Sequence, residues 1–332
     1  MTDDDATIRL APARKVAPPH PAPAPSGAGR KALLIGGAAL VLFAVAAGGL
    51  FWLGRAPEEP PAKPEAPTVV LAPPVASPAP ITPPLEIGPP IATEAEILAH
   101  RAAVPSVFRL AENPRVFVFD FPGLATQGAA LNRVAALVEK VGQPRDRVLD
   151  DAALARAIAV SGDTPATYYY GHNYRGRDVE RFFALAERDG IALTPEETWL
   201  RREVARLRRL VPAPAEFAIV SVPGVEQRVD EAMRRAILHH EIGHGHFFTN
   251  DRFAAHVARI WREAFTEAER AGFRAFLERE GYDPALEEVM MNEAMAYLVF
   301  TPDARFFTPS HAGLTEARAA ELAAALRAGA PR

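Results

Sequence analysis

Residues 230–245 read DEAMRRAILHHEIGHG, and the last part of this segment contains the pattern HExxH, from His240 to His244. Residues four apart lie on one face of a helix, about 5–6 Å from each other, so the two histidines can direct their imidazoles at one cation. Glu241, next to His240, can take a proton from a water bound to that cation. The pattern therefore predicts a metal site suited to hydrolysis.

The flanking residues predict the helix that this pattern requires. Asp230 is the expected N-cap, and the inward-facing positions from Met233 to His244 recur at helical spacing. Gly243 costs about 1 kcal/mol of helix propensity, which is tolerable where another backbone approaches closely, and Gly245 is the expected end of the helix. The alternative is a chance match in which both histidines are ordinary core residues.

Two histidines do not close a stable zinc site, so a third protein ligand is required. Residues 290–300 read MMNEAMAYLVF, in which Asn292 and Glu293 are the only strongly polar residues. A buried carboxylate without a partner is costly, and coordination of a divalent cation would remove that cost. Glu293 is therefore the candidate third ligand, with Asn292 and Tyr297 as its expected hydrogen-bonding neighbours. An ion pair between Glu293 and an arginine is the alternative.

The pair of motifs, HExxH and NEAMAY, resembles the gluzincin arrangement of zinc metallopeptidases, in which a second helix supplies a glutamate ligand. The resemblance covers about 70 residues and implies a zincin-like domain with a small sheet and an active-site helix. It implies that His240, His244 and Glu293 are zinc ligands and that Glu241 is the general base and proton shuttle. Tyr297 departs from that pattern, because an aspartate often stands there.

Two other ligand patterns would use a third ligand other than Glu293. A metzincin site requires glycine and histidine where this chain has Phe247 and Asn250, so that pattern is excluded. An aspartate-ligand site would use Asp251 or Asp303. Asp251 is the expected N-cap of the next helix and Asp303 lies in a predicted loop, so Glu293 is favoured.

A zinc hydrolase also needs a donor that stabilises the oxyanion. The aromatic and polar segment 168–174 offers Tyr170 and His172, and His311 lies in a loop beyond the second motif. These residues are candidates for oxyanion donors or for neighbours of the ligands. A packed strand and turn, and a surface histidine, are the respective alternatives.

Composition excludes several classes of function. The formal net charge is -4 and the pI about 6.2, so the chain lacks the excess of basic residues that is typical of nucleic-acid-binding proteins. The chain has no cysteine, which excludes thiolate ligands, cysteine nucleophiles and disulfides. Histidine and carboxylate side chains remain as ligands, and Zn²⁺ is the expected cofactor.

Residues 32–53 carry no charge over 22 residues and are bounded by Lys31 and Arg55. This length spans a bilayer, and the basic residues before it place the N-terminus in the cytoplasm by the positive-inside rule. The sequence predicts a single-pass protein of the cytoplasmic membrane with its catalytic domain outside, in the periplasm. A cleaved signal peptide is the alternative, although the apolar run exceeds the usual length of such a peptide.

The chain divides into four expected parts: a disordered cytoplasmic tail (1–31), a transmembrane anchor (32–54), a linker (55–90) and a metallohydrolase domain (91–332). The linker is expected to be extended because 13 of the 34 residues from Pro57 to Pro90 are proline. The domain is predicted to be helix-rich α+β. Its strands are expected at 116–121 and 217–222, and its helices at 126–141, 150–160, 178–188, 194–210, 230–245, 251–280 with a break at Gly272, 284–300 and 315–327.

These features together predict a membrane-anchored zinc-dependent hydrolase. A peptidase acting on peptide or protein substrates, with Glu241 as general base, is the leading hypothesis. A zinc amidase acting on cell-wall material shares the same metal chemistry and differs in the shape of its cleft. A catalytically silent domain that uses the metal for stability and presents a binding surface is the alternative from another class, and an intact Glu241 argues against it.

Overall fold

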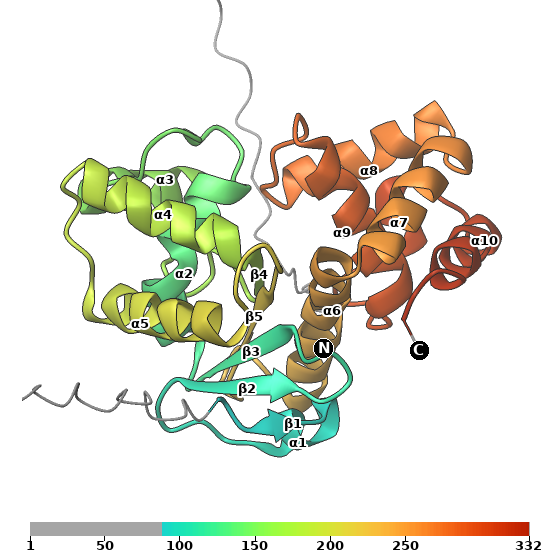
Figure 1. Cartoon of the computed structure of the whole chain (residues 1–332). Coiled ribbons are helices and arrows are strands. Elements are labelled where there is room, and N and C mark those ends of the chain that lie inside the picture. The colour runs from blue at the N-terminus through green and yellow to red at the C-terminus, as the bar shows by residue number, and fades with distance from the viewer. Residues whose placement is uncertain (1–87, 332) are drawn as a thin grey trace, which may run out of the picture. The chain divides into compact units, whose positions relative to one another are not determined.

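Five strands form one mixed sheet in the order β1-β2-β3-β5-β4 in a computed structural model, which describes residues 88–331 (Figure 1). The strands are β1 (Ile91–Ala92), β2 (Ser106–Leu110), β3 (Val116–Phe121), β4 (His172–Arg175) and β5 (Ala218–Pro223). The predicted tail, anchor and most of the linker lie outside these residues. No helix within the described range combines the length and the apolar character needed to cross a membrane.

The two central strands are the ones that the sequence predicts. β3 (VFVFDF) and β5 (AIVSVP) are buried at every position and pair in parallel, from Val116 opposite Ala218 to Phe121 opposite Pro223. Continuous apolar runs of this kind are typical of strands covered on both faces. β4 begins within segment 168–174, for which a strand and turn was the alternative interpretation. β1 and β2 were not predicted, because they are short or carry polar residues.

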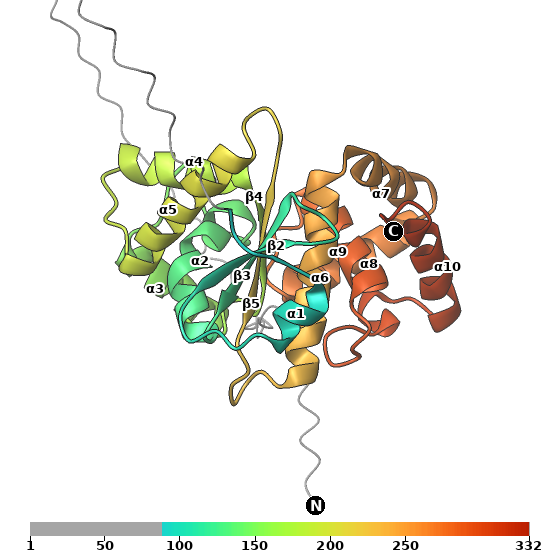
Figure 2. The ribbon, with the colours of Figure 1, turned by 60° about the horizontal axis from the view of Figure 1, so that its bottom comes forward.

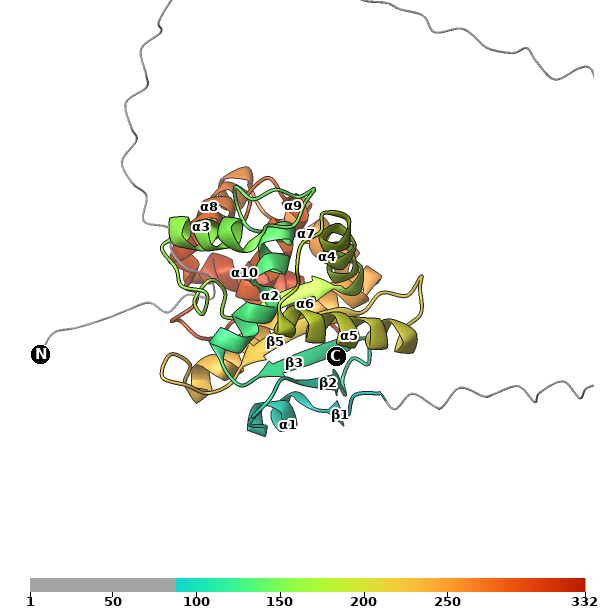
Figure 3. The same cartoon turned by 90° about the vertical axis from the view of Figure 1, so that its left-hand side faces the viewer.

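Helices cover both faces of the sheet. The layer on one side contains α2 (Leu124–Val138), α3 (Asp151–Ser161), α4 (Gly176–Arg188) and α5 (Pro195–Leu210), and Figure 3 views the molecule from this side. The opposite side carries α6 (Glu231–Thr249), with α1 (Glu94–Ala99) beside it (Figure 2). Beyond α6 lie α7 (Asp251–Glu263), α8 (Glu267–Arg279), α9 (Glu287–Phe300), the short 3-10 helix η1 (Pro309–Ala312) and α10 (Glu316–Arg327). The domain is therefore helix-rich α+β, as predicted.

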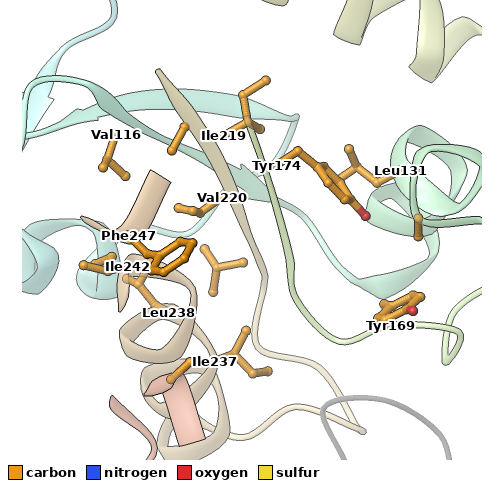
Figure 4. Packing of buried hydrophobic residues seen from close by; sticks show 14 of the residues in the cluster. Val116, Leu131, Tyr169, Tyr174, Ile219, Val220, Ile237, Leu238, Ile242 and Phe247 are labelled. Carbon is orange, nitrogen blue, oxygen red and sulfur yellow. The ribbon is translucent and has the colours of Figure 1, made fainter. Parts of the chain in front are cut away.

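One hydrophobic core extends over both faces of the sheet. Leu238, Ile242 and Phe247 of α6 lie on the same side of the sheet as Val220, and Tyr174 and Leu131 lie on the other (Figure 4). All of these side chains are buried. Burial of this kind fixes the axis and rotation of α6, and with them the direction in which its histidines point.

Most predicted helix starts agree with the structure. Thr194 and Glu197 form the expected capping box, with Glu197 N donating to Thr194 Oγ1 at 3.1 Å and Thr194 N donating to Glu197 Oε2 at 2.9 Å. Asp230 caps α6 by accepting a hydrogen bond from Met233 N at 2.7 Å. Apart from the 230–245 and 251–280 segments, the predicted helix boundaries lie within three residues of the observed ones.

The predicted end of α6 at Gly245 is wrong, because the helix continues to Thr249. A Cβ on Gly245 would lie 2.8 Å from Val116 Cγ1, so this glycine allows α6 to approach β3 closely. Gly243 has a similar role toward the ring of Phe300, where a side chain rather than the expected backbone approaches. Both glycines lie within α6 and allow neighbouring elements to pack closely against it.

The predicted helix 251–280 is two helices, and its break lies before Thr266 rather than at Gly272. Thr266 begins α8 with a capping box to Glu269. Gly272 lies within α8, where an added Cβ would be 2.2 Å from the carbonyl oxygen of Ala312. The N-cap of α7 is Asn250, which accepts from Phe253 N at 3.1 Å, and not Asp251 as expected.

Candidate metal centre

Helices α6 and α9 pack against each other and bring His240, His244 and Glu293 together. The Nε2 atoms of the two histidines lie 3.0 Å apart. The Glu293 carboxyl oxygens lie 3.5 Å from His240 Nε2 and 3.5 Å from His244 Nε2. All three side chains are buried, with at most 2% of any of them exposed.

These distances fit a single metal ion held by three donors. Two ligands that each lie about 2.0–2.1 Å from a tetrahedral zinc ion are roughly 3.3–3.4 Å apart, close to the three separations observed here. Among residues 88–331, Glu293 pairs with the two histidines and with no arginine, so the alternative of an arginine ion pair is wrong. The buried His-His-Glu group could therefore hold a metal ion.

The hydrogen bonds around Thr301 fix the orientation and tautomer of His240. Thr301 Oγ1 donates its proton to the carbonyl oxygen of Ala296 at 3.0 Å and lies 2.7 Å from His240 Nδ1. Because the hydroxyl proton is already used, Thr301 accepts a hydrogen bond from Nδ1–H. The Nε2 lone pair of His240 is then free to bind a metal.

The second histidine has a different environment. His244 Nδ1 and Asn292 Oδ1 are both buried without a hydrogen-bond partner, and Asn292 lies close enough to raise the pKa of His244. The ring of Phe248 stacks on that of His244, with the ring centroids 6.4 Å apart. Asn292 is therefore next to a ligand, as the sequence predicts, and Tyr297 likewise packs its ring 4.9 Å from that of His240.

Burial sets the protonation of the two histidines. Burial and, to a smaller extent, the charge of His239 lower the pKa of His240 to about 3. Burial also lowers the pKa of His244 to about 4, although Glu293 opposes this shift. Both imidazoles are neutral at pH 7, the form in which histidine binds metals.

Glu293 is buried in the same region without a full set of partners. Its Oε2 atom has no hydrogen-bond partner, and burial raises the pKa of the carboxyl against the opposing effects of His244 and Tyr282. The free-energy cost of burying this carboxylate next to two neutral imidazoles is offset when a cation binds between the three donors.

Glu241 is held from the strand side of the site. Its Oε2 atom accepts a hydrogen bond from Asn173 Nδ2 at 2.9 Å, and both residues are buried. Gly171 lies so close that an added Cβ would be 2.1 Å from Glu241 Oε1. Burial raises the pKa of Glu241 well above its usual value, and the charge of Glu293 raises it further.

No family model, curated protein or solved structure matches this chain.

His172 and Tyr170, two of the sequence candidates, make contacts outside this group. His172 and Asn173 alternate along β4, so His172 faces Ser221 (3.1 Å from its Nδ1) on the side of the strand opposite to Glu241. The carbonyl oxygen of Tyr170 accepts a hydrogen bond from Gln127 at 2.9 Å, and its hydroxyl lies near Arg228. Both therefore contact other parts of the fold.

His311 belongs to η1 and packs against Phe276 and Phe307, with ring centroids 5.6 Å and 6.1 Å away. Those two phenylalanines in turn pack on Tyr297, so at least one layer of aromatic rings separates His311 from His240. Asp303, the alternative ligand, pairs instead with Arg305 at 2.7 Å. Neither of these residues is part of the metal-binding group.

Sequence reasoning missed the two residues that orient the site. Thr301 follows α9 directly, and its position one residue after an apolar motif was the only local sign of a role. Asn173 belongs to the aromatic and polar segment 168–174, but nothing in that segment distinguishes it from its neighbours. Its contact with Glu241 depends on the pairing of β4 with β5, which places Asn173 opposite Val220.

A pocket of about 350 Å³ opens beside the group. Its walls come from the end of α2, from β4 and the start of α4, from Phe248 at the end of α6, and from the first turns of α9 with the loop before them. The lining residues are Val138, Glu139, Asn173, Arg175, Asp178, Phe248, Ala285, Leu286, Glu287, Glu288, Val289, Asn292 and Glu293. Glu293 thus lies both in the metal-binding group and at the pocket wall.

Proposed function

We propose that this chain is a zinc-dependent hydrolase that cleaves peptide bonds. The observation that carries the proposal is the convergence of three buried donors, from His240, His244 and Glu293, beside a fourth buried carboxyl, Glu241, that is held by Asn173. A site built only for metal binding has no need of a buried carboxyl that is not a ligand. This arrangement is the one expected from the gluzincin resemblance.

The donor set favours zinc. Two neutral imidazoles and one carboxylate form a common ligand set of catalytic zinc sites, and the chain has no cysteine to supply a thiolate set. Zinc held in this way lowers the pKa of a bound water to about 7 and polarises a carbonyl group. Three protein ligands leave one coordination position for that chemistry.

Glu241 is assigned the proton transfers. Its Oε2 atom is fixed by Asn173, and the side chain lies close enough to Glu293 to be affected by its charge. It accepts a proton from the attacking water as the new C–O bond forms, and it delivers that proton to the amine as the C–N bond breaks. Burial keeps bulk water away from this carboxyl, so the proton stays available for the second step.

The position of β4 supports a peptide as substrate. β4 is the edge strand of the sheet on the side of β5, and its residues Asn173 and Arg175 line the pocket that reaches Glu293. An extended peptide can bind beside such a strand through backbone hydrogen bonds while one side chain enters a pocket. The proposed location of this domain outside the cytoplasmic membrane rests on the apolar segment 32–53.

The test compares the full-length protein, purified in detergent, with Glu241→Gln, using zinc content and cleavage of a peptide library as readouts. We expect Glu241→Gln to retain zinc and to lose turnover by at least about 1000-fold, because the site loses the carboxyl that is assigned to accept the proton. Glu231→Gln is the matched control, since Glu231 lies in the exposed first turn of the same helix. Equal turnover in Glu241→Gln and wild type would refute the peptidase proposal, as would zinc-loaded protein that cleaves no peptide.

A further inference from the structure

The pocket beside the metal-binding group has more acidic than basic residues. Five carboxyl side chains and one guanidinium line it. Arg175, the guanidinium, pairs with Glu288 across the pocket, and Glu287 pairs with Arg274 at 2.8 Å. With Glu293 assigned to the metal, two carboxyls of the lining remain.

Those two carboxyls are Asp178 and Glu139, and neither forms an ion pair within residues 88–331. Asp178 lies in the first turn of α4 and is half-buried. Burial raises its pKa although Arg175 and Arg177 act in the opposite direction. Glu139 is buried, accepts a hydrogen bond from Tyr174 at 3.3 Å and has its pKa raised to about 8, mainly by burial and then by the charge of Glu293. Both carboxyls would be stabilised by a cation in the pocket.

The rest of the wall is largely apolar. Asn292, which also lines the pocket, is 4% exposed and lies against His244, whose pKa it raises. The neighbouring apolar lining, from Val138, Phe248, Leu286 and Val289, offers contact to a methylene chain. Acceptors and an apolar wall together fit a guest that has a long apolar stem and a cationic end.

We propose that this pocket binds a lysine or arginine side chain of the peptide substrate, with Asp178 as the main determinant of that preference. The proposal rests on the proposed peptidase function. The volume of about 350 Å³ is of the size that small ligands occupy, and the pocket wall includes Glu293, so a side chain bound here lies close to the reacting centre. Asp178 contributes charge, while Glu139 contributes an acceptor.

The experiment measures the preference of the full-length zinc-loaded protein at each position of a peptide library, and then repeats the measurement with Asp178→Asn and Asp178→Lys. At one position near the cleaved bond, we expect wild type to prefer lysine or arginine over norleucine by about tenfold or more in kcat/KM, the ratio expected from one hydrogen bond between charged groups. Asp178→Asn should lower this ratio toward one. Asp178→Lys should turn it into a preference for glutamate, which a purely structural role of Asp178 does not predict.

Glu187→Gln is the matched control, because Glu187 lies on the same helix, pairs with Arg201 at the surface and is not part of the pocket wall. A second readout is binding of uncleaved peptides to Glu241→Gln, followed by fluorescence anisotropy, with and without Asp178→Asn. If peptides are cleaved with no basic preference, or with a preference that Asp178→Lys leaves unchanged, the pocket assignment is wrong and the peptidase function stands. If no peptide is cleaved, the function itself fails.

Discussion

His240 Nδ1 lies 2.7 Å from Thr301 Oγ1, and the same hydroxyl donates to the carbonyl oxygen of Ala296 at 3.0 Å. Because the Thr301 hydroxyl donates its proton to Ala296, it can only accept from His240, so Nδ1 of His240 carries the proton. A residue at the end of α9 therefore selects the tautomer of a ligand on α6. The same helix also supplies Glu293, so α9 contributes both one donor and the orientation of another.

Replacement of Thr301 by valine should weaken zinc binding. Valine keeps the shape of threonine but removes the acceptor for His240 Nδ1–H, and loss of such a partner costs about 10- to 100-fold in metal affinity. Thr301→Ser retains the hydroxyl and should bind zinc nearly as tightly as wild type. Competition with a chelating dye measures the three dissociation constants. Equal affinity in Thr301→Val and wild type would show that the hydroxyl does not orient this ligand.

Replacement of Asn173 by alanine should reduce turnover while zinc remains bound. The lost hydrogen bond is made to a carboxylate, and bonds of that kind are worth about 1.5–3 kcal/mol, which corresponds to roughly 10- to 150-fold in kcat. His172→Gln is the matched control, because His172 is adjacent but faces the other side of β4. Zinc content and single-turnover cleavage give the two readouts. A fall in zinc content that parallels the fall in turnover would contradict this role.

Much of the metal-binding group was predictable because its members belong to local patterns. The HExxH segment combines helical spacing with an N-cap, and the strongly polar pair Asn292 and Glu293 stands out in the otherwise apolar segment 290–300. Each pattern is complete within about 15 residues, so each could be interpreted without knowledge of the tertiary structure. The distance between the two patterns along the chain does not matter once each helix presents one polar stripe to the other.

The parts that were not predictable depend on pairing between distant segments. Asn173 reaches Glu241 only because β4 pairs with β5 in one register, and a shift of one residue would present His172 in its place. Gly245 has the composition of a helix end, but close packing against Val116 overrides that local preference. His311 was a candidate because it lies in a predicted loop beyond the helix of Glu293, and the aromatic layer between it and the site could not be inferred from sequence.

Removal of metal should destabilise wild type more than Glu293→Gln. In the metal-free protein, Glu293 is a buried carboxyl whose Oε2 atom has no hydrogen-bond partner, and its raised pKa means that the folded state disfavours the charged form. A neutral amide removes that cost, so we expect metal-free Glu293→Gln to be more stable than metal-free wild type, by about 1–3 kcal/mol.

Zinc should reverse this order. At a free concentration of 100 times its dissociation constant, a ligand stabilises the folded state by about 2.7 kcal/mol, and Glu293→Gln lacks one donor for it. Thermal unfolding of wild type and Glu293→Gln, each with excess zinc and with a chelator, measures the four Tm values. A Tm of Glu293→Gln that rises with zinc as much as that of wild type would exclude Glu293 as a ligand.

His172 should make the fold sensitive to acid. Burial lowers its pKa from 6.5 to about 3, so between these pH values the unfolded chain binds one proton more than the folded protein at this residue. The free energy of unfolding then falls as the pH falls, by up to about 1.4 kcal/mol per pH unit. Stability from this residue is complete above pH 6.5 and is lost progressively toward pH 3.

His172→Gln should therefore show a shallower loss of stability between pH 6.5 and about 3 than wild type. Both proteins are unfolded with urea in the presence of a chelator, so that the ligand histidines contribute equally and the difference between the two curves reports His172. Glutamine keeps a hydrogen-bonding group near Ser221 and is neutral at every pH. A difference in pH dependence therefore reports protonation of His172 rather than a change in packing. Parallel curves would mean that His172 binds its proton in the folded state, which requires solvent to reach a side chain that is only 1% exposed.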